Sequence, residues 1–245
     1  MVAITSGKLL ITGGSGYIGA WIVKRAVDRG YSVVAAVRTD AQGQFIVNRF
    51  PEYKGKVTYV LVPVIEKDGA YDEAVKDVDA IIHAASPVPI NLDFDDPQDI
   101  LRPTIRGSLG ILESAYKFGK NVKRIIYTSS STAIGFPADE EGPLVRDETM
   151  WNTRAIAEIE TLGKNVHPGC VYLASKTYAE RDSWAWVKEH APSWDFVAVL
   201  PSYTWGPYIH EVRQATMLSI HQSMNDELGA VVSALSIKLG RKDLG

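Results

Sequence analysis

A glycine-rich segment near the start of the chain constrains the fold most strongly. Residues Thr12–Gly19 read Thr-Gly-Gly-Ser-Gly-Tyr-Ile-Gly, and they follow an apolar run and precede a stretch of helical period. In a strand–loop–helix unit, Gly13 suits the tight turn, Gly16 lets the backbone approach a pyrophosphate, and Gly19 allows close packing of the helix. The unpaired N–H groups at the start of the helix would bind the anion. The segment therefore predicts a dinucleotide-binding unit, and the alternative is a glycine turn with a structural role alone.

The chain continues as an alternation of short apolar runs and helical patterns. The apolar runs carry Val, Ile, Leu or Ala at both parities, which is typical of parallel strands covered on both faces. Apolar residues at helical spacing mark Ile18–Arg29 and Ile105–Tyr116, and a third helix is predicted from about Tyr172 to His190. The alternation predicts an α/β fold with a doubly wound parallel sheet, whose ligand crevice lies beyond the carboxyl ends of the strands. The six predicted strands are Lys8–Thr12, Tyr31–Arg38, Lys56–Val62, Asp79–Ala85, Lys123–Thr128 and Asp195–Leu200.

The charge balance and the single cysteine exclude several classes of protein. The 245 residues contain 26 Lys and Arg against 29 Asp and Glu, so there is no basic excess for a nucleic acid or an anionic membrane. Cys170 is the one cysteine, which excludes an internal disulfide and a thiolate metal site, and the histidines lack metal-ligand spacing. The sequence shows no leader pattern and no apolar run of membrane-spanning length. A cytoplasmic protein without a bound metal is predicted.

The residue at the end of the second predicted strand bears on the choice of cofactor. Proteins that prefer NAD place a carboxylate there, which accepts hydrogen bonds from the ribose. This chain has Val37-Arg38-Thr39-Asp40, so a guanidinium stands at that point. Because a guanidinium can pair with a 2′-phosphate, Arg38 predicts NADP(H). The alternative is a solvated Arg38, with Asp40 binding the ribose.

A tyrosine and a lysine four residues apart lie on one face of a helix, and the chain has two such pairs of interest. Tyr116 and Lys120 end the helix before the fifth predicted strand, whereas Tyr172 and Lys176 begin the helix after it. The second pair also follows the hydroxyl cluster Thr128–Ser131, at the carboxyl end of that strand. Only this arrangement directs a hydroxyl, a phenol and a lysine at the crevice.

Several motifs in a specific order resemble those of the extended short-chain dehydrogenase/reductases. The resemblance is closest to the branch of dihydroflavonol reductases, cinnamoyl-CoA reductases and fungal aldehyde or methylglyoxal reductases, and it covers the chain from Met1 to Pro207. It implies a carbonyl reductase that uses NADPH. The motifs are the glycine loop, His83-Ala84-Ala85-Ser86-Pro87, Tyr127-Thr128-Ser129-Ser130, Asp147-Glu148-Thr149-Met150-Trp151-Asn152, Tyr172…Lys176 and Leu200-Pro201…Gly206-Pro207.

The resemblance also implies roles for individual residues. Ser130, Tyr172 and Lys176 would form a catalytic triad, with Ser129 or Ser131 as alternatives to Ser130. Tyr172 would protonate the developing alkoxide, and Ser130 would hydrogen-bond the same oxygen. Lys176 would hold the ribose and lower the pKa of the phenol from its ordinary value of about 10. The residues expected at the cofactor are Gly13, Gly16, Tyr17, Ile18, Gly19, Arg38, Ala84, Ala85, Ser86, Tyr172, Lys176, Pro201 and Ser202.

Three features depart from the pattern of that family. Val64 and its neighbours follow the third strand where relatives carry an aspartate for adenine, which puts the adenine contact in doubt. Arg106 stands where relatives have an asparagine that helps to organise a proton relay to the lysine. Arg106 would either repel Lys176 or be a surface residue after a local shift. Relatives also continue for roughly another hundred residues, which complete a substrate lobe.

The ending predicts two parts of unequal size. Residues 1–207 would form the NADP-binding Rossmann domain with the catalytic residues, and residues 208–245 would be a short helical remnant of a truncated substrate lobe. We expect this tail to leave the pocket open on one side, which admits water and weakens catalysis. The apolar residues at helical spacing in the tail are Leu228, Val231, Val232, Leu235 and Leu239.

Three functions fit these observations. The first is reduction of an aldehyde or ketone by NADPH, in secondary metabolism. The second is a nucleotide-sugar epimerase or dehydratase of the same superfamily, which Arg38 disfavours because those enzymes usually retain NAD. The third is a non-catalytic, NADP-binding regulatory or vestigial protein, which the short ending favours and the set Ser130, Tyr172 and Lys176 disfavours. The expected partner is a small carbonyl substrate, with no nucleic acid or membrane, and the protein is expected to be a monomer or a homodimer.

Overall fold

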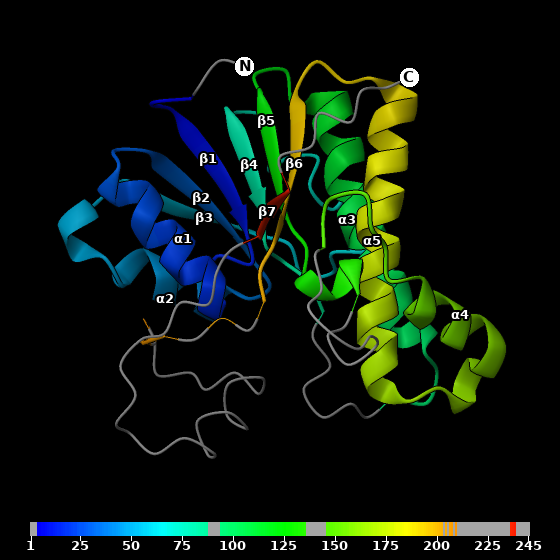
Figure 1. Cartoon of the computed structure of the whole chain (residues 1–245). Helices are drawn as coiled ribbons and strands as arrows, with labels where there is room; N and C mark the ends of the chain where they lie inside the picture. Colours follow the sequence, from blue (N-terminus) through cyan, green and yellow to red (C-terminus); the bar gives the residue numbers. More distant parts are fainter. Residues whose placement is uncertain are drawn as a thin grey trace.

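A seven-stranded sheet forms the centre of the computed structural model (Figure 1). The structure describes residues 4–87, 94–135 and 146–202, residues 204, 206, 207 and 209, and the backbone of a strand at 236–238. The strand order is β3-β2-β1-β4-β5-β6-β7, in which β1 to β6 are parallel and β7 is antiparallel to β6. The strands are β1 (Lys8–Thr12), β2 (Ser32–Val37), β3 (Val57–Leu61), β4 (Ala80–His83), β5 (Arg124–Thr128), β6 (Asp195–Leu200) and β7 (Ser236–Lys238).

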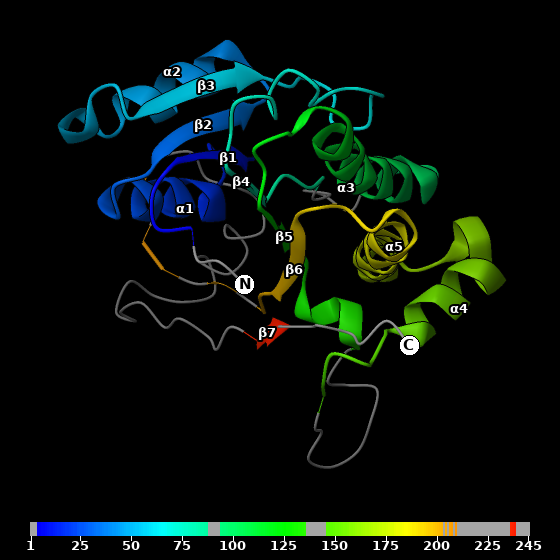
Figure 2. The ribbon, with the colours of Figure 1, turned by 90° about the horizontal axis from the view of Figure 1, so that it is seen from above.

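Helices cover both faces of the sheet. Figure 2 shows α1 on one side, and α3 and α5 together on the other. The α-helices in the described part of the chain are α1 (Tyr17–Asp28), α2 (Asp40–Asn48), α3 (Gln98–Phe118), α4 (Thr153–Leu162) and α5 (Pro168–His190), and the short 3₁₀ helices are η1 (Pro51–Tyr53), η2 (Ser131–Ile134) and η4 (Gly163–Asn165). None of the described helices is long and apolar enough to cross a bilayer.

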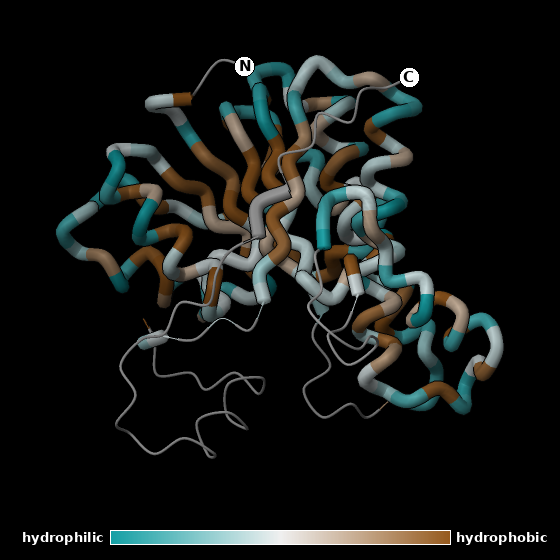
Figure 3. The backbone as a smooth tube through the Cα atoms, in the orientation of Figure 1, coloured by the Kyte–Doolittle hydropathy of each residue, from teal (hydrophilic) through white to brown (hydrophobic). Residues whose placement is uncertain are grey.

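The apolar strands separate two hydrophobic clusters. Along β1, Leu9 and Ile11 belong to the cluster shared with α1 and α2, whereas Leu10 belongs to the cluster shared with α3 and α5. Successive side chains of a strand point to opposite faces, so a strand between two helical layers must be apolar at every position. The hydrophobic colour of the central strands in Figure 3 follows this rule. This burial on both faces explains why runs of apolar residues at both parities identified the strands in the sequence.

The predicted doubly wound parallel sheet is confirmed, and each of its six predicted strands lies within two residues of the observed bounds. Two helices were missed. One is α2, which begins with a capping box between Thr39 and Gln42. The other is α4, which lies between the fifth predicted strand and the third predicted helix, where the sequence pattern indicated no helix. Asn152 caps α4, and the pair Arg154–Glu158 joins successive turns at a nitrogen–oxygen distance of 2.8 Å.

The predicted helical tail is wrong at its end. Residues Ser236–Lys238 pair with β6 as strand β7, with Val199 opposite Ile237. Leu228, Val231, Val232, Leu235 and Leu239 lie outside the described residues. The division of the chain at residue 207 stays a prediction.

Candidate active site

The glycine loop joins β1 to α1 at the carboxyl end of the sheet. Gly13 has a φ of +68°, and a Cβ atom there would lie 3.0 Å from the backbone nitrogen of Ala85. A Cβ atom on Gly19 would lie 2.0 Å from the carbonyl oxygen of Gly13, so the helix touches its own loop. Gly16 is the N-cap of α1, and α1 has no side-chain cap and no acidic residue in its first turn. This end of α1 therefore suits an anionic group such as a pyrophosphate.

Thr12 connects the loop to the end of β4. Its Oγ1 accepts hydrogen bonds from the N–H groups of Ala84 and Ala85 at 3.1 and 3.0 Å, and it lies 2.9 Å from His83 Nδ1. Because Thr12 Oγ1 already accepts two hydrogen bonds, its own O–H is assigned as the donor to His83 Nδ1, which accepts. Burial lowers the pKa of His83 to about 3, and the charge of Lys176 adds to the effect. His83 is therefore a neutral structural residue.

Arg38 and Asp40 have different environments at the end of β2. The backbone N–H of Arg38 donates to Gln42 Oε1 at 3.1 Å, and the Arg38 side chain is exposed beside the start of α2. The carboxylate of Asp40 instead accepts a hydrogen bond from the hydroxyl of Tyr59 at 2.5 Å. The Tyr59 hydroxyl occupies one oxygen of Asp40, and Arg38 stays the residue predicted to meet the 2′-phosphate.

Helix α5 brings Tyr172 and Lys176 together. Lys176 Nζ lies 6.0 Å from the centre of the Tyr172 ring. The lysine is 4% exposed, and burial lowers its pKa to about 8, while the charge of Glu180 acts in the opposite direction. The other pair is remote from this point, because Tyr116 lies near the end of α3, half exposed, against the rings of Trp186 and His190.

The three serines after β5 differ in their contacts. Ser129 Oγ donates to Glu180 Oε2 at 2.5 Å, and both side chains are buried. Ser130 Oγ accepts from the Thr132 hydroxyl at 2.9 Å, and the N–H of Ser131 donates to the carbonyl of Pro201 at 2.9 Å. The Ser129 hydroxyl is committed to a carboxylate, which favours Ser130 as the hydroxyl of the site. Ser202 follows Pro201, so both lie beside these serines at the ends of β5 and β6.

A separate cavity of about 700 Å³ lies on the α1 side of the sheet. Its lining combines apolar residues of α1 and of the strands with the side chains of Arg25, Arg29 and Arg124, and Gly206 and Pro207 lie at its wall. The hydroxyl of Tyr17 donates to the Gly206 carbonyl and the indole N–H of Trp21 donates to the Pro207 carbonyl, each at 2.9 Å. Neither Tyr172 nor Lys176 reaches this cavity, so it is not the reaction site. Tyr17 and Ile18, expected at the cofactor, also line this cavity, and their role at the cofactor stays a prediction. Ser86 Oγ donates to the carbonyl of Pro87 at 3.4 Å.

Comparison with known proteins identifies the family. The model of the NAD dependent epimerase/dehydratase family matches residues 9–233. The chain belongs to this family.

Relatives within the NAD dependent epimerase/dehydratase family include named reductases. Ketoreductase azaE of Aspergillus niger is 37% identical over 205 residues, which are 82% of this chain and 58% of that protein. Dihydroflavonol 4-reductase of Arabidopsis thaliana is 32% identical over 201 residues, 81% of this chain and 50% of that protein. The crystal structure of yeast methylglyoxal/isovaleraldehyde reductase Gre2 complexed with NADPH matches with a TM-score of 0.78 and 28% identity, over 88% of this chain and 65% of that one.

The resemblance to the dihydroflavonol and methylglyoxal reductases is thus confirmed. The chain spans 58% and 50% of the length of these two curated relatives. The matched part contains the glycine loop, Arg38, Ser130, Tyr172 and Lys176.

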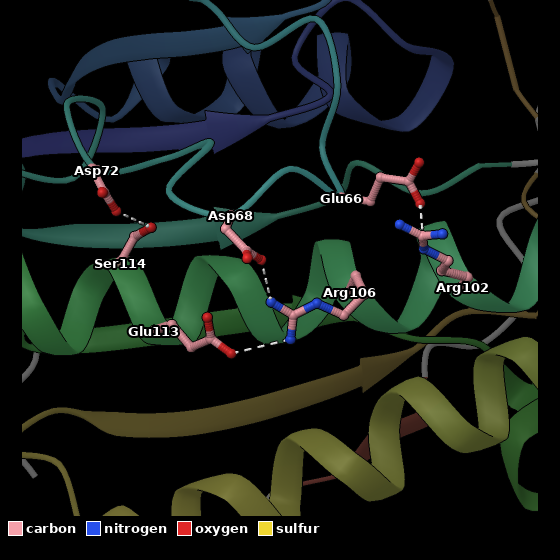
Figure 4. Close-up of polar contacts among 7 residues, drawn as sticks. All are labelled: Glu66, Asp68, Asp72, Arg102, Arg106, Glu113 and Ser114. Carbon is pink, nitrogen blue, oxygen red and sulfur yellow. Dashed lines mark hydrogen bonds and ion pairs between the residues drawn. The ribbon is translucent and has the colours of Figure 1, made fainter.

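Arg106, one departure from the family pattern, turns toward the segment between β3 and β4. Figure 4 shows its guanidinium between two carboxylates, Asp68 at 2.8 Å and Glu113 at 3.2 Å. Arg102 pairs with Glu66 on the same face of α3 at 3.7 Å. The influences on the pKa of Lys176 are burial and Glu180, and Arg106 is not among them. The expectation that Arg106 repels Lys176 is therefore wrong, because two carboxylates neutralise its charge.

The segment that Arg106 holds includes Val64, where relatives carry the adenine-binding aspartate. Val64 is 52% exposed, and Ile65 beside it packs against Gly107 of α3. Ser114 Oγ donates to Asp72 at 2.7 Å, which ties the later part of the segment to the same helix (Figure 4). The segment around Val64 is thus anchored to α3, and Val64 offers no carboxylate to an adenine.

We expect Arg106→Asn to have a small effect. A partly exposed ion pair contributes about 0–1 kcal/mol and Arg106 makes two, so the free energy of unfolding should fall by no more than about 2 kcal/mol. Since Arg106 does not act on Lys176, the pKa of that lysine should stay unchanged. Urea denaturation and an NMR titration of Lys176 measure the two quantities. A rise in the pKa of Lys176 by half a unit or more would show that the guanidinium does repel it.

Two residues of the site were not predicted. Glu180 is one turn beyond Lys176 on α5. The sequence signal that could have found it is the regular spacing of four residues from Tyr172 to Lys176 to Glu180, which places all three on one helix face. Thr12 was quoted only as the first residue of the glycine loop. A threonine at the carboxyl end of a buried strand can form hydrogen bonds with the loop after a neighbouring strand. This could have suggested the contact of Thr12 with Ala84 and Ala85.

Proposed function

We propose that this chain carries the cofactor-binding and catalytic part of an NADPH-dependent reductase that acts on aldehydes or ketones. The observation that carries the proposal is the buried Lys176 beside Tyr172 on α5, at the strand ends that also hold the glycine loop and Ser130. The names of the ketoreductase, dihydroflavonol reductase and methylglyoxal reductase relatives support the same chemistry.

The residues present fit a dinucleotide phosphate. The uncapped start of α1 offers N–H groups to the pyrophosphate, and Gly13 and Gly19 keep the loop close to the helix. Arg38 is exposed beside the start of α2, where it would pair with the 2′-phosphate. When bound, the nicotinamide would supply the hydride for carbonyl reduction.

The side chains divide the remaining work. The Ser130 hydroxyl would donate a hydrogen bond to the carbonyl oxygen, and Tyr172 would give its proton to that oxygen as the alkoxide develops. The charge of Lys176 would stabilise the phenolate that Tyr172 becomes. Burial strengthens this interaction because the local dielectric is low.

The test is a pair of measurements on the whole chain. Titration with NADPH should show binding, and NADPH oxidation should be followed against a panel of aldehydes and ketones. Oxidation with any member supports the reductase proposal and excludes the regulatory alternative. Tight binding with no oxidation by the whole panel would favour the non-catalytic function, and absence of binding would refute both.

We expect Arg38→Ala to remove most of a preference for NADPH over NADH. A charge-assisted contact to a phosphate contributes about 1.5–3 kcal/mol, which corresponds to roughly a 10- to 150-fold loss of NADPH affinity. NADH lacks the 2′-phosphate, so its affinity should hardly change. Isothermal titration of both cofactors into both proteins measures the effect. Arg49→Ala, at the far end of α2, is the matched control. Equal affinities for the two cofactors in the parent chain would contradict the assignment.

A further inference from the structure

A fully buried carboxylate lies next to the proposed site, and the proposed mechanism leaves it without a role. Glu180 is on α5, one turn beyond Lys176, and its side chain is 0% exposed. Burial of an ionised carboxylate is costly unless hydrogen bonds and an opposite charge compensate for the lost water. Its surroundings therefore indicate what it does.

Hydrogen bonds from two directions reach this carboxylate. Ser129 Oγ donates to Oε2 at 2.5 Å, and the indole N–H of Trp184 approaches Oε1 at 3.4 Å. The backbone of Ser129 is itself fixed, because its N–H donates to the carbonyl of Val199 on β6. Glu180 thus joins α5, which carries Tyr172 and Lys176, to the end of β5, one residue before Ser130.

The charge of the carboxylate also acts on Lys176. The Coulomb interaction with Glu180 raises the pKa of the lysine against the larger effect of burial, which brings that pKa to about 8. Without the carboxylate, burial alone would favour the neutral amine still more.

The other titratable groups around Lys176 do not replace this charge. His83 on β4 is neutral, and burial raises the pKa of Tyr127 on β5 above its usual range, so both are uncharged near neutral pH. Tyr172 on α5 is the proposed proton donor. On α3, which packs against α5, Arg102 and Arg106 are paired with carboxylates of the segment between β3 and β4. Within the described part of the chain, Glu180 is the negative group that acts on Lys176.

We propose that Glu180 is a positioning residue of this site: through Ser129 it holds the end of β5 against α5, and its negative charge keeps Lys176 protonated. The inference rests on the proposed reductase function. Glu180 thereby joins Ser130, Tyr172 and Lys176 as a fourth side chain of the site. Unlike them, it touches neither substrate nor cofactor, and it acts through Lys176 and Ser129.

The first test is the pH profile of Glu180→Gln. Gln keeps the size of the side chain and an oxygen that can accept from Ser129, but it removes the charge. The pKa of Lys176 should fall by about one unit, as expected for the loss of one neighbouring charge. The alkaline limb of kcat/KM should therefore move by about one unit to lower pH, while parent and variant converge toward pH 6. An equal loss of rate at every pH, with the limb unmoved, would overturn the charge role.

Glu189→Gln is the matched control, because it makes the same change on α5 at an exposed position. It should leave the limb in place. Glu180→Asp retains the charge and should keep the limb close to that of the parent, even if the shorter side chain lowers the rate.

The second test needs neither turnover nor a variant of Glu180. In the free protein, the ¹³Cε signal of Lys176, assigned with Lys176→Arg, should titrate near pH 8. The carboxyl carbon of Glu180 should show an inflection at the same pH, because each group senses the charge of the other. Absence of that inflection would overturn the inference. If the two signals share the inflection but the chain reduces no carbonyl, the link between Glu180 and Lys176 is supported and the proposed function is overturned instead.

Discussion

Tyr172→Phe is expected to lower the rate of carbonyl reduction by about 10²–10⁴-fold, the usual contribution of a positioned proton donor. The substitution deletes one hydroxyl and keeps the ring, so the fold and most of the NADPH affinity should remain. Steady-state NADPH oxidation gives the rate, and circular dichroism with cofactor titration checks the fold and the site.

Tyr116→Phe is the control for this prediction. Tyr116 also precedes a lysine by four residues, but it is 52% exposed near the end of α3 and packs against Trp186 and His190. Its replacement should change the rate less than twofold, an effect on the order of 0.4 kcal/mol. If the Tyr116 variant were inactive and the Tyr172 variant active, the wrong pair would have been assigned to the site.

Gly19→Ala should damage both the fold and cofactor binding. The added Cβ would lie 2.0 Å from the carbonyl oxygen of Gly13, so α1 or the loop must move. Overpacking of this kind costs about 1–3 kcal/mol or more in the free energy of unfolding. Because the loop is the proposed pyrophosphate site, NADPH affinity should fall at least about tenfold, or 1.4 kcal/mol.

Gly110→Ala provides a matched comparison in another helix. Gly110 lies inside α3, and the nearest atom to its added Cβ would be the carbonyl oxygen of Ile65 at 3.9 Å, an ordinary contact. Ala is a better helix former than Gly, so the variant should gain roughly 0.5–1 kcal/mol in stability and bind NADPH normally. Urea denaturation of both variants measures the contrast. Similar stabilities would mean that the close contact at Gly19 relaxes at little cost.

The sheet could be predicted because its strands are buried on both faces. A strand such as β2, Ser-Val-Val-Ala-Ala-Val, is apolar at five of its six positions, and this pattern does not depend on which neighbour it pairs with. Helix α4 could not be recognised in the same way. It buries Ala155 and leaves most of its other side chains partly or fully exposed, so its polar residues look like those of a loop. Strand β7 has three residues, too few to show any period.

The candidate site was predictable where the local sequence determines it. The glycine loop needs residues without side chains at fixed spacing, and Tyr172 and Lys176 share a helix face through their spacing of four. Partners from distant segments were beyond this reasoning. Arg106 meets Asp68 from 38 positions away, and Ser129 meets Glu180 from 51 positions away. Only the folded chain shows that the first contact neutralises a charge and the second connects two parts of the site.

The strand order determines when this site can assemble during folding. Thr12 and His83 lie side by side at the ends of β1 and β4 although 71 residues separate them, and the same separation divides Arg124 on β5 from Asp195 on β6. Contacts between such distant segments form only after long loops have closed, which slows folding and makes the central strand pairs late events. These strand pairs also bring the parts of the candidate site together. The parts are the glycine loop, the hydroxyls after β5 and the lysine of α5. A chain in which those strand pairs have not formed therefore has no binding-competent crevice, and we expect recovery of cofactor affinity during refolding to report formation of the central strand pairs.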